Sequence, residues 1–452
     1  MHGKAHTSYA GKLIELISIQ DFITGARFRE SLDTIDKDGS FDLQMYSNHT
    51  QPVFLIIKNV KAKLYVSPDF VYEVRIPETD ESADFKNDAE LEINLGVVGA
   101  DSTELNALIF DFQNKYNAQF LTDKKQFLSR PVIFQKADSL QFICEKSYKN
   151  IKNKYFQSFY NYSIASLNAS VSRGENFLIS KYILNSPIQY HHAEYMSFFN
   201  ACFTGYLNSI ASTRKGETLY NIINTKASYE LLDEFVKQEK FMINDSLREL
   251  VILKNLWELY FNTSFNAPAI NKIVSEINQS TKIEKHRQIS AHMLSNFNQL
   301  QNGSPAPFFS ARDKKGNMAD LNEIKGKWIY LNFFSTKKTE STKELYKIAA
   351  LKKKLGDKII FVSVCVDDSL STYTSFMKNN AKLDWNIWYY QDKRLQKNAK
   401  ELYHLVGHEA YYLINNAGYL AQSPALSPSE GIEYKLNSIF KPVKKNIKTG
   451  IR

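Results

Sequence analysis

The stretch LNFFSTKKTESTKEL, residues 331–345, decides the fold of the C-terminal third of this chain. It opens with an apolar run that is typical of a buried strand and continues into a charged segment with helical spacing. The residues Lys338, Thr339, Glu340 and Ser341 lie where the expected helix begins. None of the four contains sulfur. A strand that leads directly into a helix in this way predicts a layered α/β domain.

The same alternation continues downstream of this stretch. Apolar runs predict strands, and segments with helical periodicity between them predict helices. The expected strands are 328–334, 358–366, 410–414 and 419–422, and the expected helices are 338–355 and 369–378.

Upstream, the sequence changes character twice. Residues up to about 98 contain short alternating runs separated by turn signals, a pattern that predicts a small β-sandwich. The expected strands are 13–19, 41–45, 53–57, 62–66, 71–76 and 91–95. From about residue 101 to 301 the spacing is helical, and two prolines near residue 305 then end it. We therefore expect a multidomain chain: a β-sandwich (1–99), an α-helical domain (100–301), an α/β domain (302–440) and a basic tail (441–452).

Two apolar faces support the helical assignment. Leu105, Leu108, Ile109 and Phe112 fall on one side of a helix, and residues 243, 247, 250 and 257 fall on one side of another. Aromatic residues are dense in 155–162 and 190–206. They could form a core or a docking face, and we expect a core.

The composition narrows the functional class. Of 452 residues, 43% are hydrophobic and 23% are charged, as in a soluble globular protein. The net charge of +9 is spread over short basic runs, so we expect no nucleic-acid partner. We also expect no transmembrane segment, and the first residues show no apolar core of an export signal.

The cysteine and histidine patterns indicate no metal site and no cofactor. The three cysteines, Cys144, Cys202 and Cys365, are far apart in the sequence, and Cys365 lies in an apolar run that predicts a buried strand. Among the histidines, 191 and 192 are adjacent, whereas 286 and 292 do not have the spacing of one helix face. We expect the cysteines to be inert core residues.

Several motifs along the C-terminal third, taken in order, resemble the TlpA/ResA-type thioredoxin-like family. They are GSPAPF (303–308), DKKGN (313–317), IKGKW (324–328), LNFF (331–334), VSV (362–364) with Asp367, and LINNAG (413–418). The resemblance implies a thioredoxin-like fold over about 303–440. It also implies a Cys-x-x-Cys pair at the helix N-terminus, where the helix dipole lowers the pKa of the first thiol.

This chain departs from that pattern at two separate places. Lys338 and Ser341 occupy the two cysteine positions, with Thr339 and Glu340 between them. The resemblance also implies a cis-proline opposite the thiols, but the segment YHLVGHEA (403–410) has Glu409 there. A non-proline cis bond costs about 3 kcal/mol, so we expect a trans bond. Redox chemistry at this site is therefore not expected.

A looser resemblance covers the upstream part of the chain. The start near residues 10–12, the turn at 38–41 and the segment 187–199 are similar to Bacteroidetes envelope proteins that carry a β-domain and a helical segment before the thioredoxin-like domain. The resemblance implies a periplasmic or cell-envelope location and a protein partner there.

Three hypotheses follow from these observations. The first is a redox-inactive, non-enzymatic binding or scaffold protein, whose cleft would include Phe334, Lys338, His408 and Glu409. The second is a thiol–disulfide oxidoreductase that works through a cysteine outside the motif, such as Cys365. The third is a hydrolase or other enzyme that uses Lys338, Glu340, His408 and Glu409 for acid–base chemistry, although such clusters are more often solvated ion pairs.

Overall fold

A computed structural model describes residues 1–57, 60–78, 91–120, 130–170, 174–324, 326–367, 370–389, 399–403, 405 and 409–440. The expected tail at 441–452 lies outside these residues. The described chain forms two compact units. The first holds the described residues up to Leu294 except Phe261–Ser264, and the second holds Phe261–Ser264 and the described residues from Ser295 onward.

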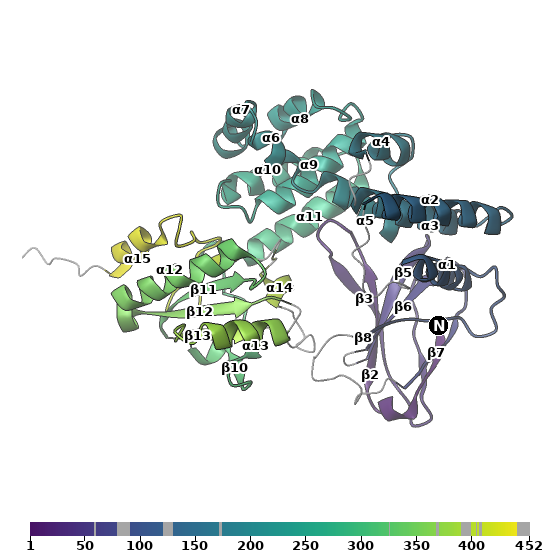
Figure 1. Ribbon diagram of the computed structural model, residues 1–452, viewed down its shortest axis with the longest axis horizontal. Coiled ribbons are helices and arrows are strands. Elements are labelled where there is room, and N and C mark those ends of the chain that lie inside the picture. The colour runs from purple at the N-terminus through teal and green to yellow at the C-terminus, as the bar shows by residue number, and fades with distance from the viewer. Residues whose placement is uncertain are drawn as a thin grey trace, which may run out of the picture. The chain divides into compact units, whose positions relative to one another are not determined.

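The first unit begins with strands that form two sheets (Figure 1). Among the described residues, one sheet has the order β4-β1-β7 and the other the order β3-β2-β5-β6-β8. The strands are β1 (His2–Ala5), β2 (Leu13–Ile19), β3 (Arg27–Thr34), β4 (Ser40–Asp42), β5 (Gln51–Ile57), β6 (Val60–Val66), β7 (Glu73–Ile76) and β8 (Leu91–Asn94). Side chains from both sheets share one buried core, which includes Ile14, Phe41, Leu55 and Val74.

Helices make up the rest of the first unit, and the last of them, α11, ends in residues assigned to the second unit. They are α1 (Leu105–Phe120), α2 (Arg130–Ser147), α3 (Lys154–Ser170), α4 (Glu175–Ile179), α5 (Ala193–Phe203), α6 (Tyr206–Ala211), α7 (Gly216–Tyr220), α8 (Tyr229–Lys237), α9 (Asp245–Leu259), α10 (Ala267–Ser280) and α11 (Glu284–Gln299). The four apolar residues predicted to share a helix face are all buried on α1. By contrast, Ile243 is 83% exposed. It precedes Asn244, whose side chain caps α9, so its predicted place on that helix is wrong.

The strands and helices of the first unit are joined by specific contacts. Asn106 on α1 bonds to both the N–H and the carbonyl of Tyr65 on β6, at 2.8 and 2.9 Å. The Tyr65 hydroxyl donates to Glu194 on α5 at 2.8 Å. Aromatic residues of α3 and α5, such as Phe156 and Phe199, are fully buried, which confirms that they form a core. The domain boundaries at 99 and 301 stay predictions.

The second unit is built on one mixed sheet. Among the described residues its order is β10-β9-β13-β12-β11-β14-β15. The strands are β9 (Ser310–Arg312), β10 (Met318–Asp320), β11 (Trp328–Phe334), β12 (Ile359–Cys365), β13 (Asn386–Tyr389), β14 (Ala410–Ile414) and β15 (Leu420–Gln422). The helices are α12 (Thr339–Leu355), α13 (Leu370–Asn379), α14 (Ala399–Leu402) and α15 (Ile432–Phe440).

The sheet separates two cores because successive side chains of a strand point to opposite faces. Ile329, Leu331 and Phe333 lie in one core. Tyr330 and Phe334 lie in the other, together with apolar residues of α12, α13 and α15. Strand β11 pairs in parallel with β12 and antiparallel with β14, so the expected α/β layering of this part of the chain is confirmed.

Candidate functional site

The candidate site is the turn that joins β11 to α12. Strand β11 ends at Phe334, and Thr339 begins the helix after Lys338 at the N-cap position. No side-chain hydrogen bond caps the helix there, because a lysine ammonium has only donors to offer. Lys338, Thr339 and Glu340 are exposed, whereas Ser341 is buried. The chain thus presents three side chains at the helix N-terminus and turns the fourth inward.

Ser341 holds the turn together from inside. Its hydroxyl oxygen accepts a hydrogen bond from the backbone N–H of Ser335 at 3.1 Å, and both residues are 1% exposed. A buried backbone N–H must find an acceptor, and this hydroxyl supplies one. The residue at the second cysteine position of the resemblance therefore has a structural contact in this chain.

A second anchor of the turn is the carboxylate of Asp367, which follows β12. It accepts hydrogen bonds from the Ser335 hydroxyl at 2.5 Å, from the Thr336 N–H at 2.8 Å and from the Thr336 hydroxyl. Burial raises the pKa of this carboxyl, but these hydrogen bonds outweigh burial and hold the pKa below its ordinary value. Asp367 is therefore an ionised, buried clamp on the turn.

The sequence signal for this clamp is indirect. Strands β11 and β12 are parallel neighbours, and Phe334 pairs with Cys365 at their ends. Residues just after parallel strands meet at the same edge of a sheet, so Ser335 and Asp367 could have been paired once the register was known. In the sequence alone, Asp367 is recognisable only as part of a motif, and its partners Ser335 and Thr336 are not.

Cys365 is the last residue of β12, two positions before Asp367, and its side chain lies inside the core. Its side chain is fully buried, and its thiol contacts the Asp367 carboxylate. Burial raises the pKa of the thiol well above its ordinary value. This confirms the expectation of a buried strand cysteine and leaves the thiol group in its neutral, weakly nucleophilic form at neutral pH.

Of the other residues expected in the cleft or in an acid–base cluster, the structure describes Phe334, Glu340 and Glu409. Phe334 is 1% exposed and belongs to a core. Glu340 pairs with Lys343 at 2.7 Å on its own helix. Glu409 is half-buried directly before β14, whose Ala410 pairs with Phe333, so it lies at the same sheet edge as the turn. His408, and with it the expected trans bond before Glu409, lies outside the described residues.

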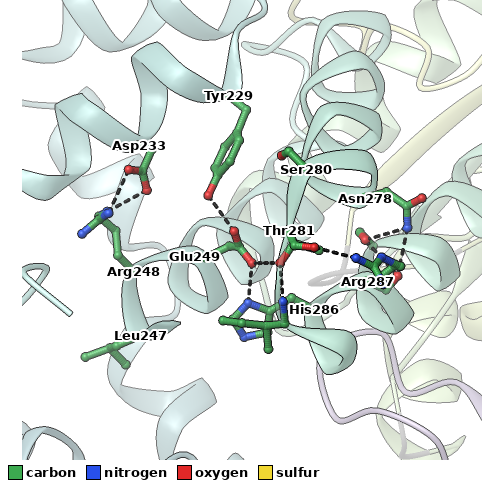
Figure 2. A network of polar contacts seen from close by, with 12 residues as sticks. Tyr229, Asp233, Leu247, Arg248, Glu249, Asn278, Ser280, Thr281, His286 and Arg287 are labelled. Carbon is green, nitrogen blue, oxygen red and sulfur yellow. Dashed lines mark hydrogen bonds and ion pairs between the residues drawn. The ribbon is translucent and has the colours of Figure 1, made fainter. Parts of the chain in front are cut away.

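The helical part of the first unit contains a second polar cluster, centred on Glu249 of α9 (Figure 2). Its carboxylate accepts from Tyr229 at 2.7 Å and from Thr281 at 2.5 Å, and it contacts His286 Nδ1 at 2.6 Å. Burial raises the pKa of Glu249, but these three partners outweigh burial and lower it. The cluster satisfies a buried charge with donors from three other segments, as stable cores require.

The remaining candidate groups are histidines and cysteines of the first unit. Among the described residues, no set of three or more His, Cys, Asp or Glu side chains has the geometry to hold a metal ion. The adjacent pair at 191 and 192 was expected on a helix, but His192 has extended backbone angles and caps the start of α5. Cys144 is buried on α2, and burial raises the pKa of its thiol to about 12.

Among known proteins, a family match covers the C-terminal part of the chain. The AhpC/TSA family matches residues 302–423. This part of the chain is thioredoxin-like. No curated protein matches the chain.

Solved structures of Bacteroides proteins are similar to the chain. A proposed thiol-disulfide oxidoreductase from Bacteroides vulgatus is 25% identical, covers 31% of this chain and 97% of its own, and has a TM-score of 0.29. A thioredoxin-like protein from Bacteroides caccae is 16% identical over 60% of this chain and 94% of its own, with a TM-score of 0.38. A thiol:disulfide interchange protein from a Bacteroides species is 21% identical over 33% and 97%, with a TM-score of 0.30.

Proposed function

We propose that this chain is a redox-inactive member of the TlpA/ResA-type thioredoxin-like proteins and acts as a binding or scaffold component of the bacterial cell envelope. The proposal rests on which residues occupy the N-terminus of α12. Lys338 and Ser341 stand at the two cysteine positions, and the hydroxyl of Ser341 is bonded to the turn. Thiol–disulfide exchange needs an attacking thiolate and a second sulfur, and neither position supplies one.

The exposed side chains of the turn support a binding role. Lys338, Thr339 and Glu340 project from a backbone that is fixed at Ser335 and Thr336 by Asp367. Residues held on a rigid scaffold lose little conformational entropy when a partner binds, which favours recognition. The partner would be a protein of the envelope.

No described helix has both the length and the apolar character needed to span a membrane.

The alternative is an oxidoreductase that works through Cys365. Its burial and its raised pKa count against attack on a substrate disulfide, because the thiolate is the nucleophile and must reach the sulfur. The acid–base enzyme hypothesis has no support from the described residues either, since Glu340 is paired with Lys343. We retain the binding role as the proposed function.

Insulin reduction with dithiothreitol as electron donor tests the proposal. We expect the wild-type chain and the Cys365→Ser variant to give the same rate as dithiothreitol alone. Native Cys365 should also resist Ellman's reagent until the chain is denatured. Turnover by the wild type that is lost in Cys365→Ser would replace the proposal with the oxidoreductase alternative.

A capture experiment tests the binding role itself. The chain would be used as bait in envelope extracts, beside a variant in which Lys338, Thr339 and Glu340 are all alanine. We expect at least one envelope protein to be retained by the wild type and lost with the triple variant. Equal recovery with both baits would exclude the turn as the binding surface.

A further inference from the structure

The first unit contains a hollow of about 480 Å³ that is separate in sequence from the proposed binding turn. It is formed by Thr50, which precedes β5, by the start of α3 and by the segment 188–192. Its polar lining includes Thr50, Lys154, Ser158, Gln189 and His191. Of the described residues that line it, none is acidic, and Lys154 adds a positive charge at its exposed side.

A second histidine lies directly against this lining. The rings of His49 and His191 lie against each other in a tilted arrangement, with centroids 3.5 Å apart and planes inclined by 32°. Two protonated imidazoles would repel each other strongly at this separation. This proximity therefore disfavours a proton on both rings at the same time.

Lys285 on α11 adds a third basic group. It is close enough to both rings to repel a proton on either of them. Burial, with repulsion from His49 and Lys285, lowers the pKa of His191 to about 3. Burial and Lys285 also lower the pKa of His49, and burial lowers that of Lys285 itself. Three basic groups thus destabilise one another's charged forms.

The nearby acids already have other partners. Asp21, which attracts Lys285 together with Glu284, accepts from the N–H groups of Ile23 and Thr24 and contacts His292 at 2.6 Å. Glu194 contacts His192 at 3.4 Å and Lys63 at 3.9 Å. Neither carboxylate is paired with His49 or His191 among the described contacts. Neither carboxylate therefore offsets the charge of Lys154 or of a proton gained by either ring.

One nitrogen of this histidine pair also makes no hydrogen bond of normal length among the described residues. His49 Nδ1 is 2.6 Å from the side-chain oxygen of Asn48, an acceptor, so Nδ1 carries the proton of the neutral ring. His49 Nε2 is buried and makes no hydrogen bond of normal length among the described residues, although the Gln51 side chain lies close enough to the ring to favour its protonated form. If Nε2 gained a proton, it would become a buried donor that needs an acceptor.

We propose that this hollow binds a small anion, whose carboxylate or phosphate oxygens lie beside the paired His49 and His191 rings. Anion oxygens would accept from the ring N–H groups and from the ammonium of Lys154. They would also offset the repulsion among the three basic groups. Since a bound anion favours the charged imidazole, binding takes up protons from solution. The site would take its ligand independently of the proposed binding turn.

Isothermal titration calorimetry of the full chain tests this inference, with citrate and inorganic phosphate as probes. Titrations at pH 6.5 in two buffers of different ionisation enthalpy reveal how many protons are taken up. We expect at least one of the two probes to bind with net proton uptake, and its affinity to fall about tenfold from pH 6 to pH 8. Binding of citrate alone would identify a carboxylate site, and binding of phosphate alone a phosphate site.

Variants locate the site. We expect His191→Gln to abolish the proton uptake, and Lys154→Gln to weaken binding about tenfold. Lys154 is exposed at the start of α3, so its variant keeps the fold even if His191→Gln does not. His6→Gln, at an exposed histidine outside the hollow, is the control and should bind as the wild type does. Absence of binding by both probes, or binding that is unchanged by Lys154→Gln, would overturn the inference.

Discussion

The Ser341 hydroxyl accepts the backbone N–H of Ser335 across the turn between β11 and α12. The two residues are six positions apart and both are buried. At the place where the resemblance implies a resolving cysteine, this chain therefore has a side chain that completes the hydrogen bonding of the backbone.

Ser341→Ala should lower the free energy of unfolding by about 1–3 kcal/mol. It leaves the buried N–H of Ser335 without an acceptor, and an unsatisfied buried donor costs this much. Urea denaturation would measure the change. Thr339→Ala, on the exposed side of the same turn, is the matched control and should change stability by less than about 0.5 kcal/mol. Equal effects of the two substitutions would mean that the hydroxyl is not needed.

Asp367→Asn should destabilise the chain at neutral pH and flatten its acid stability profile. The folded pKa of Asp367 lies below its ordinary value of 3.8, so the ionised carboxylate stabilises the fold above that pH. This contribution is lost as the pH falls through the folded pKa. Because hydrogen bonds to charged groups contribute about 1.5–3 kcal/mol each, the variant should lose at least that much at pH 7. Denaturation curves between pH 2 and 7 would show whether the wild type and the variant converge in acid.

Restoring sulfur at both positions, as Lys338→Cys with Ser341→Cys, should give only feeble insulin reduction. The exposed position at the helix N-terminus suits a thiolate, but Glu409 stands where the resemblance implies proline. Adding Glu409→Pro to this double variant should raise the rate. If the double variant alone reduced insulin rapidly, the presence of Glu409 in place of proline would not limit the rate of disulfide reduction.

Glu249→Gln should lower the free energy of unfolding by about 3 kcal/mol, because it removes a buried charge that has three partners. The pKa of Glu249 is lowered in the fold, so its contribution is present at neutral pH and lost in acid. Thermal unfolding at pH 7 would measure the change in the free energy of unfolding. Glu340→Gln removes an exposed ion pair and should cost less than about 1 kcal/mol.

The sequence was most informative where patterns are long and apolar. The predicted strand at 328–334 is β11 residue for residue, and the helix predicted at 338–355 differs from α12 only at its first residue. The burial of Cys365 was also predicted, since it lies in a continuous apolar run of the kind found in strands that are covered on both faces.

Short or exposed elements were missed for a physical reason. Strand β3 (Arg27–Thr34) pairs only with β2 among the described strands, and its side chains are mostly exposed. An edge strand needs no apolar run, so its sequence carries little signal. Strand β1 has four residues, too few for a periodicity to be recognised.

The polar contacts of the site were the hardest part to predict. Ser335 and Asp367 are 32 positions apart, and Glu249 and His286 are 37 apart. A single serine or glutamate in a sequence looks the same whether it is solvated or clamped inside a fold. Only the register of β11 against β12, and the packing of α9 against its neighbours, bring these partners within bonding distance.

The hydrogen bonds of Asp367 affect which substitutions the turn can tolerate. Because the inner residues of the turn secure the backbone, the three outward residues at 338–340 can be exchanged with little effect on folding. Such a place suits rapid diversification of a recognition surface during evolution. In the laboratory it offers a graft point where short peptides could be displayed on a scaffold of fixed shape.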